Sequence, residues 1–196
     1  MRRFAALGVL VGLAALAVPS CGWAADHTAR ASSDGLSPQA VDALRLVESK
    51  DPYQQQLGFL RLEALREPAT VEVIRPYLKH RNENLRAWSA RALAAIQGVQ
   101  AIPTLLDLLA HDRQPVVRRS ALLGLEPLRD LDPTMVSAFF AALRDPNPEV
   151  RMAAVDVVSR LDSGRAKEAI LLRRKRESNR DVRRVITLAM QRMGLS

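Results

Sequence analysis

The sequence predicts an all-α protein, a right-handed α-solenoid (α-α superhelix) of about five helix pairs in a single domain. Three observations support this prediction. Aromatic residues make up only 4% of a chain that is 48% hydrophobic, which suits helices packed through Ala, Leu and Val. A pattern of apolar residues recurs every 32 or 33 residues. Several prolines follow Ser, Asp or Asn, a combination typical of helix starts.

Residues 1–24 predict a secretory signal peptide. Arg2 and Arg3 precede an apolar run over residues 4–18, which is shorter than the ~20 residues that span a bilayer. Small residues before Ala25 suit cleavage by signal peptidase at that position. We therefore expect export to the periplasm or cell envelope.

Cys21 leaves an alternative open at the same end of the chain. Residues 18–21 resemble a bacterial lipobox, although Pro19 departs from its usual pattern. Lipidation of Cys21 would make the protein an outer-membrane lipoprotein, and an uncleaved anchor is a further alternative. No other cysteine occurs, so the folded region can form no disulfide. A flexible lead-in is expected over residues 25–36 and one repeat domain over residues 37–196.

The repeat is clearest in four segments that each open with an apolar residue followed by arginine. These arginines are Arg86, Arg118, Arg151 and Arg183, at spacings of 32, 33 and 32 residues. The positions two, three, six, seven and ten residues after each arginine are apolar or small, which marks one face of an α-helix. A weaker copy begins near Leu57.

A second helix is expected in each unit, over residues 71–79, 101–109, 135–143 and 166–173. Pro76 lacks the amide that a helix interior needs, so the first of these helices should kink or end early. Helix starts are marked by a capping residue and proline at Ser37-Pro38, Asp51-Pro52, Asp132-Pro133 and Asn147-Pro148. One helix pair cannot bury its apolar face alone, so neighbouring pairs must stack.

The turn segments Asp112-Arg113-Gln114-Pro115-Val116-Val117-Arg118 and Asp145-Pro146-Asn147-Pro148-Glu149-Val150-Arg151 resemble HEAT repeats. The short period is similar to the HEAT-like variety first associated with phycobilisome lyases, and the resemblance covers about residues 37–193. It implies that the aspartate before the turn and the arginine after it support the turns and a ladder between repeats. The residues concerned are Asp112, Asp145, Arg86, Arg118, Arg151 and Arg183. No matching aspartate precedes Val182.

No sequence pattern indicates a catalytic, metal-binding or cofactor-binding site. Nucleophile elbows, phosphate-binding glycine loops and paired metal-ligand motifs do not occur. His80 and His111 fall at the ends of successive second helices, where they suit helix C-termini better than a metal. Asp130 and Asp132 flank a turn, and Trp88 occupies an inward repeat position that favours core packing.

A basic segment near the C-terminus is the main candidate for partner binding. We assign this role to Arg173, Arg174, Lys175, Arg176, Arg180 and Arg184, and add Lys79 and Asp107 as outward positions on second helices. The alternative is a solvated end of the solenoid that keeps the last repeat soluble.

We therefore expect a non-catalytic scaffold or adaptor of the cell envelope or periplasm, which binds a protein partner and is not an enzyme. The formal charge of +8 does not indicate nucleic-acid binding in an exported protein. One alternative, implied by the resemblance, is a HEAT-like lyase or chaperone-like accessory acting on a cofactor-bearing protein. Another is a binder of anionic membrane surfaces through the basic segment.

Overall fold

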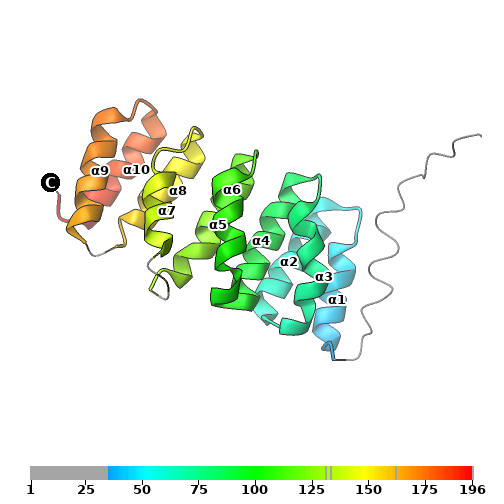
Figure 1. Ribbon diagram of the computed structural model, residues 1–196. Helices are drawn as coiled ribbons and strands as arrows, with labels where there is room; N and C mark the ends of the chain where they lie inside the picture. The colour runs from blue at the N-terminus through cyan, green and yellow to red at the C-terminus, as the bar shows by residue number, and fades with distance from the viewer. Residues whose placement is uncertain (1–34, 131, 133, 162, 196) are drawn as a thin grey trace, which may run out of the picture. The chain divides into compact units, whose positions relative to one another are not determined.

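The computed structural model describes residues 35–130, 132, 134–161 and 163–195 (Figure 1). The predicted signal peptide, Cys21 and residues 25–34 of the expected lead-in lie outside the described residues. Pro133, one of the predicted helix-start prolines, also lies outside them.

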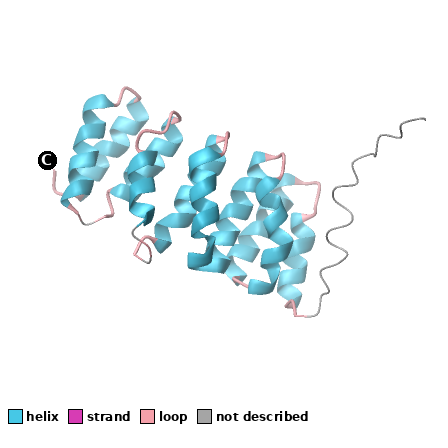
Figure 2. Cartoon of the chain, viewed as in Figure 1, coloured by secondary structure: helices cyan, strands magenta, loops and turns pink. Residues whose placement is uncertain are grey.

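All regular structure in the described residues is helical (Figure 2). The α-helices are α1 (Pro38–Val47), α2 (Pro52–Leu65), α3 (Val71–Ile74), α4 (Glu83–Gln97), α5 (Ile102–His111), α6 (Pro115–Leu125), α7 (Thr134–Ala142), α8 (Pro148–Val158), α9 (Gly164–Arg176) and α10 (Arg180–Arg192). Short 3₁₀ helices are η1 (Pro68–Thr70), η2 (Arg75–Lys79), η3 (Gly98–Ala101) and η4 (Glu126–Leu128). The predicted all-α solenoid is confirmed.

The helices form two layers in which consecutive helix pairs stand side by side in chain order (Figure 1). One layer contains α2, α4, α6, α8 and α10, each packed on its neighbours. The other contains α1, α3 with η2, α5, α7 and α9. Each pair therefore covers the apolar face of the next pair, as a solenoid requires.

Capping side chains start most of these helices. The side chains of Ser37, Asp51, Asn82, Asn147 and Asn179 each accept a backbone N–H from the first turn of the helix that follows. Such a cap satisfies an amide that has no partner inside the helix. Side-chain caps thus mark where these helices begin, whereas α6 begins after Gln114 without a side-chain cap.

Pro76 divides the third helical segment as predicted. The α3 helix ends at Ile74, and the chain continues as the 3₁₀ helix η2. A proline in a helix interior removes an amide and clashes with the preceding turn, so the tighter form takes over.

The first repeat copy starts earlier than the sequence pattern indicated. The α2 helix begins at Pro52, whereas we placed the copy near Leu57. Leu57 is 39% exposed, and the buried residues of α2 are Gly58, Phe59 and Leu62. Apolar residues lie on both faces of this helix, and the inward face therefore could not be selected from periodicity.

The core runs continuously through both layers. Its largest fully buried side chains include Phe59, Leu93, Leu122, Phe139 and Ile186, which come from successive units. Trp88 packs beside Phe59 at a ring-centroid distance of 6.3 Å, in the core position expected for it.

One stretch, Glu83–His111, is long and apolar enough for a bilayer span by length and composition. The chain there forms two helices, α4 and α5, joined by η3 and a glycine at φ 56°. The apolar character of this stretch is accounted for by its place in the solenoid core.

Candidate functional site

Three arginines form a ladder of ion pairs between successive units. Each donates two parallel hydrogen bonds, from Nε and Nη2, to the carboxylate of the next unit. The distances are 2.8 and 3.0 Å for Arg86–Asp112, 2.8 and 2.7 Å for Arg118–Asp145, and 2.9 and 2.9 Å for Arg151–Glu177. Bidentate pairs of this kind are strong and geometrically specific.

The same residues also hold the loops of their own unit. In each of the three arginines Nη1 donates to two carbonyls of the loop before its helix, as Arg118 does to Asp112 and Arg113 at 2.9 and 3.2 Å. Each carboxylate accepts the amide two residues further on, as Asp145 does from Asn147 at 2.8 Å. The ladder is therefore a structural device that joins one loop to the next.

Glu177 is the ladder residue that the sequence pattern did not reveal. It lies 26 residues after Arg151, the same separation as Arg86 to Asp112, so the register alone contained the signal. Burial of the carboxylate opposes ionisation, but hydrogen bonds from Arg151 and the Asn179 amide, together with the charge of Arg173, lower the pKa of Glu177 to about 2. The sequence pattern did not include Glu177 because the carboxylates at the corresponding positions of the earlier units belong to aspartates.

Arg183 does not take the ladder position that the resemblance implied for it. It is exposed and makes no ion pair within the described residues. Helix α10 is followed only by residues 193–195 of the described chain, without a further helix that would supply a carboxylate. Four residues after the ladder arginine, the buried Ala90, Leu122 and Val155 of earlier units are replaced by the exposed Thr187. The last described helix is therefore polar at this position, although the neighbouring Leu188 is 54% exposed.

The residues of the predicted basic segment are distributed over α9 and α10. Arg173 pairs with the buried Glu177 at 2.6 Å, and Arg174 donates to the Met190 sulfur at 3.3 Å. Arg180 and Arg184 lie on α10, where both are exposed, and Lys175 is exposed on α9. Arg176 belongs, together with Arg173, to a groove beside α7.

This α7–α9 groove has a volume of about 290 Å³ and is the best candidate for a binding site. Its lining comes from α7 with the two residues that follow it and from α9, which are separated in sequence by α8. The lining residues are Phe140, Leu143, Arg144, Arg165, Glu168, Ala169, Leu172, Arg173 and Arg176. Sequence spacing could not predict that Arg144, Arg165, Phe140 and Leu172 lie close together, because their proximity depends on how the two helices pack.

The groove combines positive charge with an apolar floor. Four arginines face one carboxylate, that of Glu168. Within the described residues Arg144, Arg165 and Arg176 make no ion pair, whereas Arg173 pairs with Glu177, which also pairs with Arg151. The Arg165 guanidinium lies 5.0 Å from the centre of the Phe140 ring, a cation–π contact. Such a lining suits a ligand that has an apolar body and carries carboxylates.

Lys79 and Asp107 lie together, as exposed residues of a second groove between η2 and α5. Asp107 pairs with His111 at 2.9 Å, and both of these side chains are about three-quarters exposed. The groove mixes charges of both signs and contains no buried polar group. It provides a weaker case for ligand binding than the α7–α9 groove.

His80 has a local role in the structure. His80 Nδ1 accepts the Asn82 amide at 3.0 Å, in the loop position that Asp112 occupies one unit later. Burial and the nearby Arg81 and Arg86 lower the pKa of His80, so its ring is neutral at neutral pH. In the described part of the chain, no three His, Cys, Asp or Glu residues gather in a way that would hold a metal ion.

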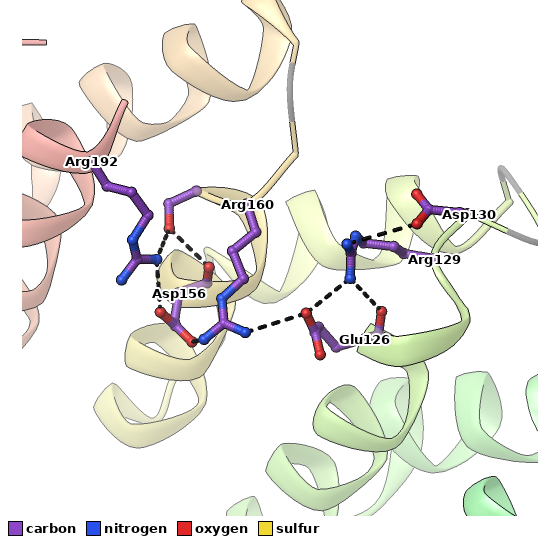
Figure 3. Close-up of polar contacts among 7 residues, drawn as sticks. Glu126, Arg129, Asp130, Asp156, Arg160 and Arg192 are labelled. Carbon is purple, nitrogen blue, oxygen red and sulfur yellow. Dashed lines mark hydrogen bonds and ion pairs between the residues drawn. The ribbon is translucent and has the colours of Figure 1, made fainter. Parts of the chain in front are cut away.

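A second network of charges joins the last units on the side of the layer that contains α8 and α10 (Figure 3). Asp156 of α8 forms ion pairs with Arg160 at 2.7 Å and with Arg192 of α10 at 3.0 Å. Arg160 also reaches Glu126, which is held by Arg129 at 3.0 Å. Arg160 and Arg192 are each 48% exposed, so solvent screens these pairs and the network contributes less stability than the buried ladder.

Helix pairs that recur at a fixed spacing, stack on their neighbours and share a polar ladder define a helical-repeat solenoid. The family model for HEAT repeats matches residues 41–126 and 127–191. This chain therefore belongs to the HEAT-repeat family.

Two curated relatives have related names. The chain is 39% identical over 77 residues to the bilin biosynthesis protein RpcE of Synechococcus sp. (strain WH8020), a match that covers 39% of this chain and 29% of the relative. It is 32% identical over 134 residues to the bilin biosynthesis protein RpcF of the same strain, covering 61% of this chain and 64% of the relative. The chain thus spans less than two thirds of each relative.

A solved structure supports the fold. The complex of CpcE and CpcF of phycocyanin lyase from Nostoc sp. PCC7120 contains a chain that superposes with a TM-score of 0.64 at 24% identity. The match covers 76% of this chain and 98% of that one.

These relatives overturn two of our expectations. We expected a non-catalytic scaffold or adaptor of the envelope and no enzyme, because the sequence contains no catalytic motif. The similarity to two bilin biosynthesis proteins contradicts both expectations and favours the lyase-type alternative. The expectation failed because helical-repeat proteins position their functional residues on stacked surfaces, which no local motif reveals.

Proposed function

We propose that this chain is a lyase-type subunit that handles a bilin, a linear tetrapyrrole, for a cofactor-bearing acceptor protein. The observation that carries the proposal is the sequence similarity to two bilin biosynthesis proteins, which extends over as many as 134 residues. A similarity of this length includes several repeat units, so it reaches beyond a single shared motif.

The α7–α9 groove supports this proposal. A bilin is a long conjugated molecule with propionate carboxylates, so it needs an apolar surface and cations within the same site. The groove offers Phe140 and Leu172 as apolar surface and Arg144, Arg165 and Arg176 as cations. In this role the chain binds and orients the bilin and keeps its reactive end away from bulk water, while the acceptor protein supplies the attachment residue.

A second protein subunit is part of the proposal. The structural neighbour is a complex of two proteins, CpcE and CpcF, and the chain is similar in sequence to both RpcE and RpcF. We propose that this chain likewise works with a protein partner, and that the complex presents the bilin to the acceptor.

A transfer assay tests the proposed function. The purified chain, alone or mixed with RpcE or RpcF, is incubated with phycocyanobilin and an apo-phycocyanin subunit. Bilin attached covalently to the acceptor is read by zinc-induced fluorescence on a denaturing gel. We expect the chain to raise the yield or the correctness of attachment over the spontaneous reaction. An unchanged yield and an unchanged product spectrum in every mixture would rule the proposal out.

We also propose that the chain is exported, on the basis of residues 1–24 and their basic and apolar pattern. Intact mass analysis of the protein purified from its native cells tests this. Cleavage before Ala25 gives a mature chain without Cys21, and lipidation gives a chain that begins at a diacylated Cys21. An intact Met1 in a protein recovered from the soluble cytoplasm would contradict export.

A further inference from the structure

We infer that the α7–α9 groove is a binding site for a flat, elongated apolar molecule with carboxylate groups, and that Arg144 and Arg176 bind those carboxylates. The inference rests on the proposed function, because it assigns the bilin to one place on the chain. It goes further in naming the residues and the part of the ligand that each of them contacts.

The charge balance of the groove points to an anionic ligand. Arg144, Arg165 and Arg176 have no carboxylate partner in the described residues, and only Glu168 adds negative charge to the lining. Other arginines of the described chain, such as Arg61, Arg66 and Arg113, also lack an ion pair, but Arg144, Arg165 and Arg176 differ from them in lining one groove. A carboxylate bound in the groove would give these arginines the charged hydrogen-bond partner that they lack.

The apolar floor points to a ligand with an apolar body. Leu172 is 45% exposed in the groove, and Phe140 lies half-buried beneath Arg165. A flat conjugated ligand would cover Leu172 and extend the stack of Arg165 and Phe140. Arg165 and Arg176 are eleven residues apart on α9, about 16 Å at 1.5 Å per residue, which suits an elongated ligand.

The helix ends favour carboxylate over phosphate. Arg173 and Arg176 lie in the last turn of α9, and Leu143 and Arg144 follow the end of α7. A helix C-terminus carries about half a negative charge, which opposes dense negative charge nearby. The arginines offset this more readily for a singly charged carboxylate than for a phosphate.

Direct binding measurements test the inference. The probes are biliverdin, which carries two propionates, and biliverdin dimethyl ester, in which both are neutral. Each is titrated into the full-length purified chain, and binding is followed by the visible absorbance and the induced circular dichroism of the bilin. We expect the ester to bind the wild-type chain at least tenfold more weakly, because its neutral ester groups cannot form charged hydrogen bonds with Arg144 and Arg176.

Matched variants locate the site. The variant Arg144→Ala/Arg176→Ala removes two groove arginines, and Lys50→Ala/Lys167→Ala removes two exposed cations that do not line the groove. Biliverdin should bind the arginine variant about tenfold more weakly and the lysine variant within about twofold. Glu168→Gln should strengthen binding, because it removes the one opposing charge in the lining.

Three results of the binding measurements would overturn the inference. They are no biliverdin binding by the wild-type chain, equal affinities for the acid and the ester, and equal losses in the arginine and lysine variants. All four substituted residues are exposed, so the far-ultraviolet dichroism and the melting temperature should stay unchanged and serve as the folding control. Covalent transfer that persists in Arg144→Ala/Arg176→Ala would reject the site and keep the function. Arginine-dependent binding without any transfer would keep the site and reject the function.

Discussion

Arg118 and Asp145 show what one residue of the ladder contributes. Their side chains are 11% and 8% exposed. Arg118 donates hydrogen bonds both to the Asp145 carboxylate of the next unit and to the Asp112 carbonyl of its own loop. Removing one member of such a pair leaves the other charge buried without a partner, which costs more than the pair itself contributes.

We expect Arg118→Ala to lower the free energy of unfolding by about 3 kcal/mol. The measurement is urea denaturation followed by circular dichroism. Arg91→Ala is the control, since Arg91 pairs with Glu63 while 43% exposed, and its loss should cost less than about 1 kcal/mol. Equal losses in the two variants would show that the ladder is no more than a surface contact.

Glu177 links stability to pH. Its pKa is about 2 in the folded chain and near 4.5 when unfolded, so the unfolded state binds the proton more tightly. Its contribution, about 3 kcal/mol, is complete above pH ~4.5 and is lost as pH falls towards ~2.

The variant Glu177→Gln isolates this contribution. The difference in unfolding free energy between the wild type and the variant should be constant from pH 7 to about 5 and should shrink steadily below about 4.5. Urea titrations at a series of pH values measure it. A difference that does not change between pH 6 and pH 3 would contradict the assigned pKa.

At the scale of the helix, the approach of α2 to α1 depends on one glycine. A Cβ added at Gly58 would lie 2.7 Å from the Ala43 carbonyl oxygen and 2.7 Å from the Val47 amide nitrogen. Both of these are backbone atoms, so α1 would have to move as a whole. No rotamer change relieves such a clash.

Gly58→Ala should therefore destabilise the protein by about 2 kcal/mol, in the range known for overpacked cores. Gly164→Ala is the matched control, because Gly164 also lies in a helix but has no atom within 4 Å of its added Cβ. That change should be neutral or slightly stabilising, by up to about 1 kcal/mol. Thermal unfolding of both variants tests the close packing of α1 and α2. Equal losses of stability in the two variants would contradict it.

On the scale of the whole molecule, stability comes from contacts between neighbouring units. The helices α4, α6 and α8 each have a packing neighbour on both sides within their layer, and α10 has one. In a repeat protein the free energy of opening a unit is the sum of its own stability and that of its interfaces.

We expect amide hydrogen exchange to be slowest in α4, α6 and α8 and faster in α1 and α10. Exchange followed by mass spectrometry of peptides measures it. The Arg118→Ala variant should speed exchange most in α6 and α8, whose loops the pair joins. Uniform protection across all helices would indicate a single cooperative unit instead.

The sequence was sufficient for the architecture because helices and their limits depend on local chemistry. Spacing of apolar residues identified the repeat, capping residues before prolines marked the starts, and Pro76 predicted the early end of α3. The arginine spacing also indicated which residues could form a ladder. It did not distinguish Arg151, which pairs with Glu177, from Arg183, which forms no ion pair within the described residues.

Only the tertiary structure decided which charged residues have partners and which line a common groove. Arg173 and Arg176 are three residues apart, yet one is held by a buried glutamate and the other lines the groove without an ion pair in the described residues. Phe140 and Arg165 come together because α7 and α9 lie in one layer while α8, between them in sequence, lies in the other. The sequence by itself determined the helical repeat, since periodicity and capping act within a few residues. The groove was decided by packing between helices that are far apart in the chain.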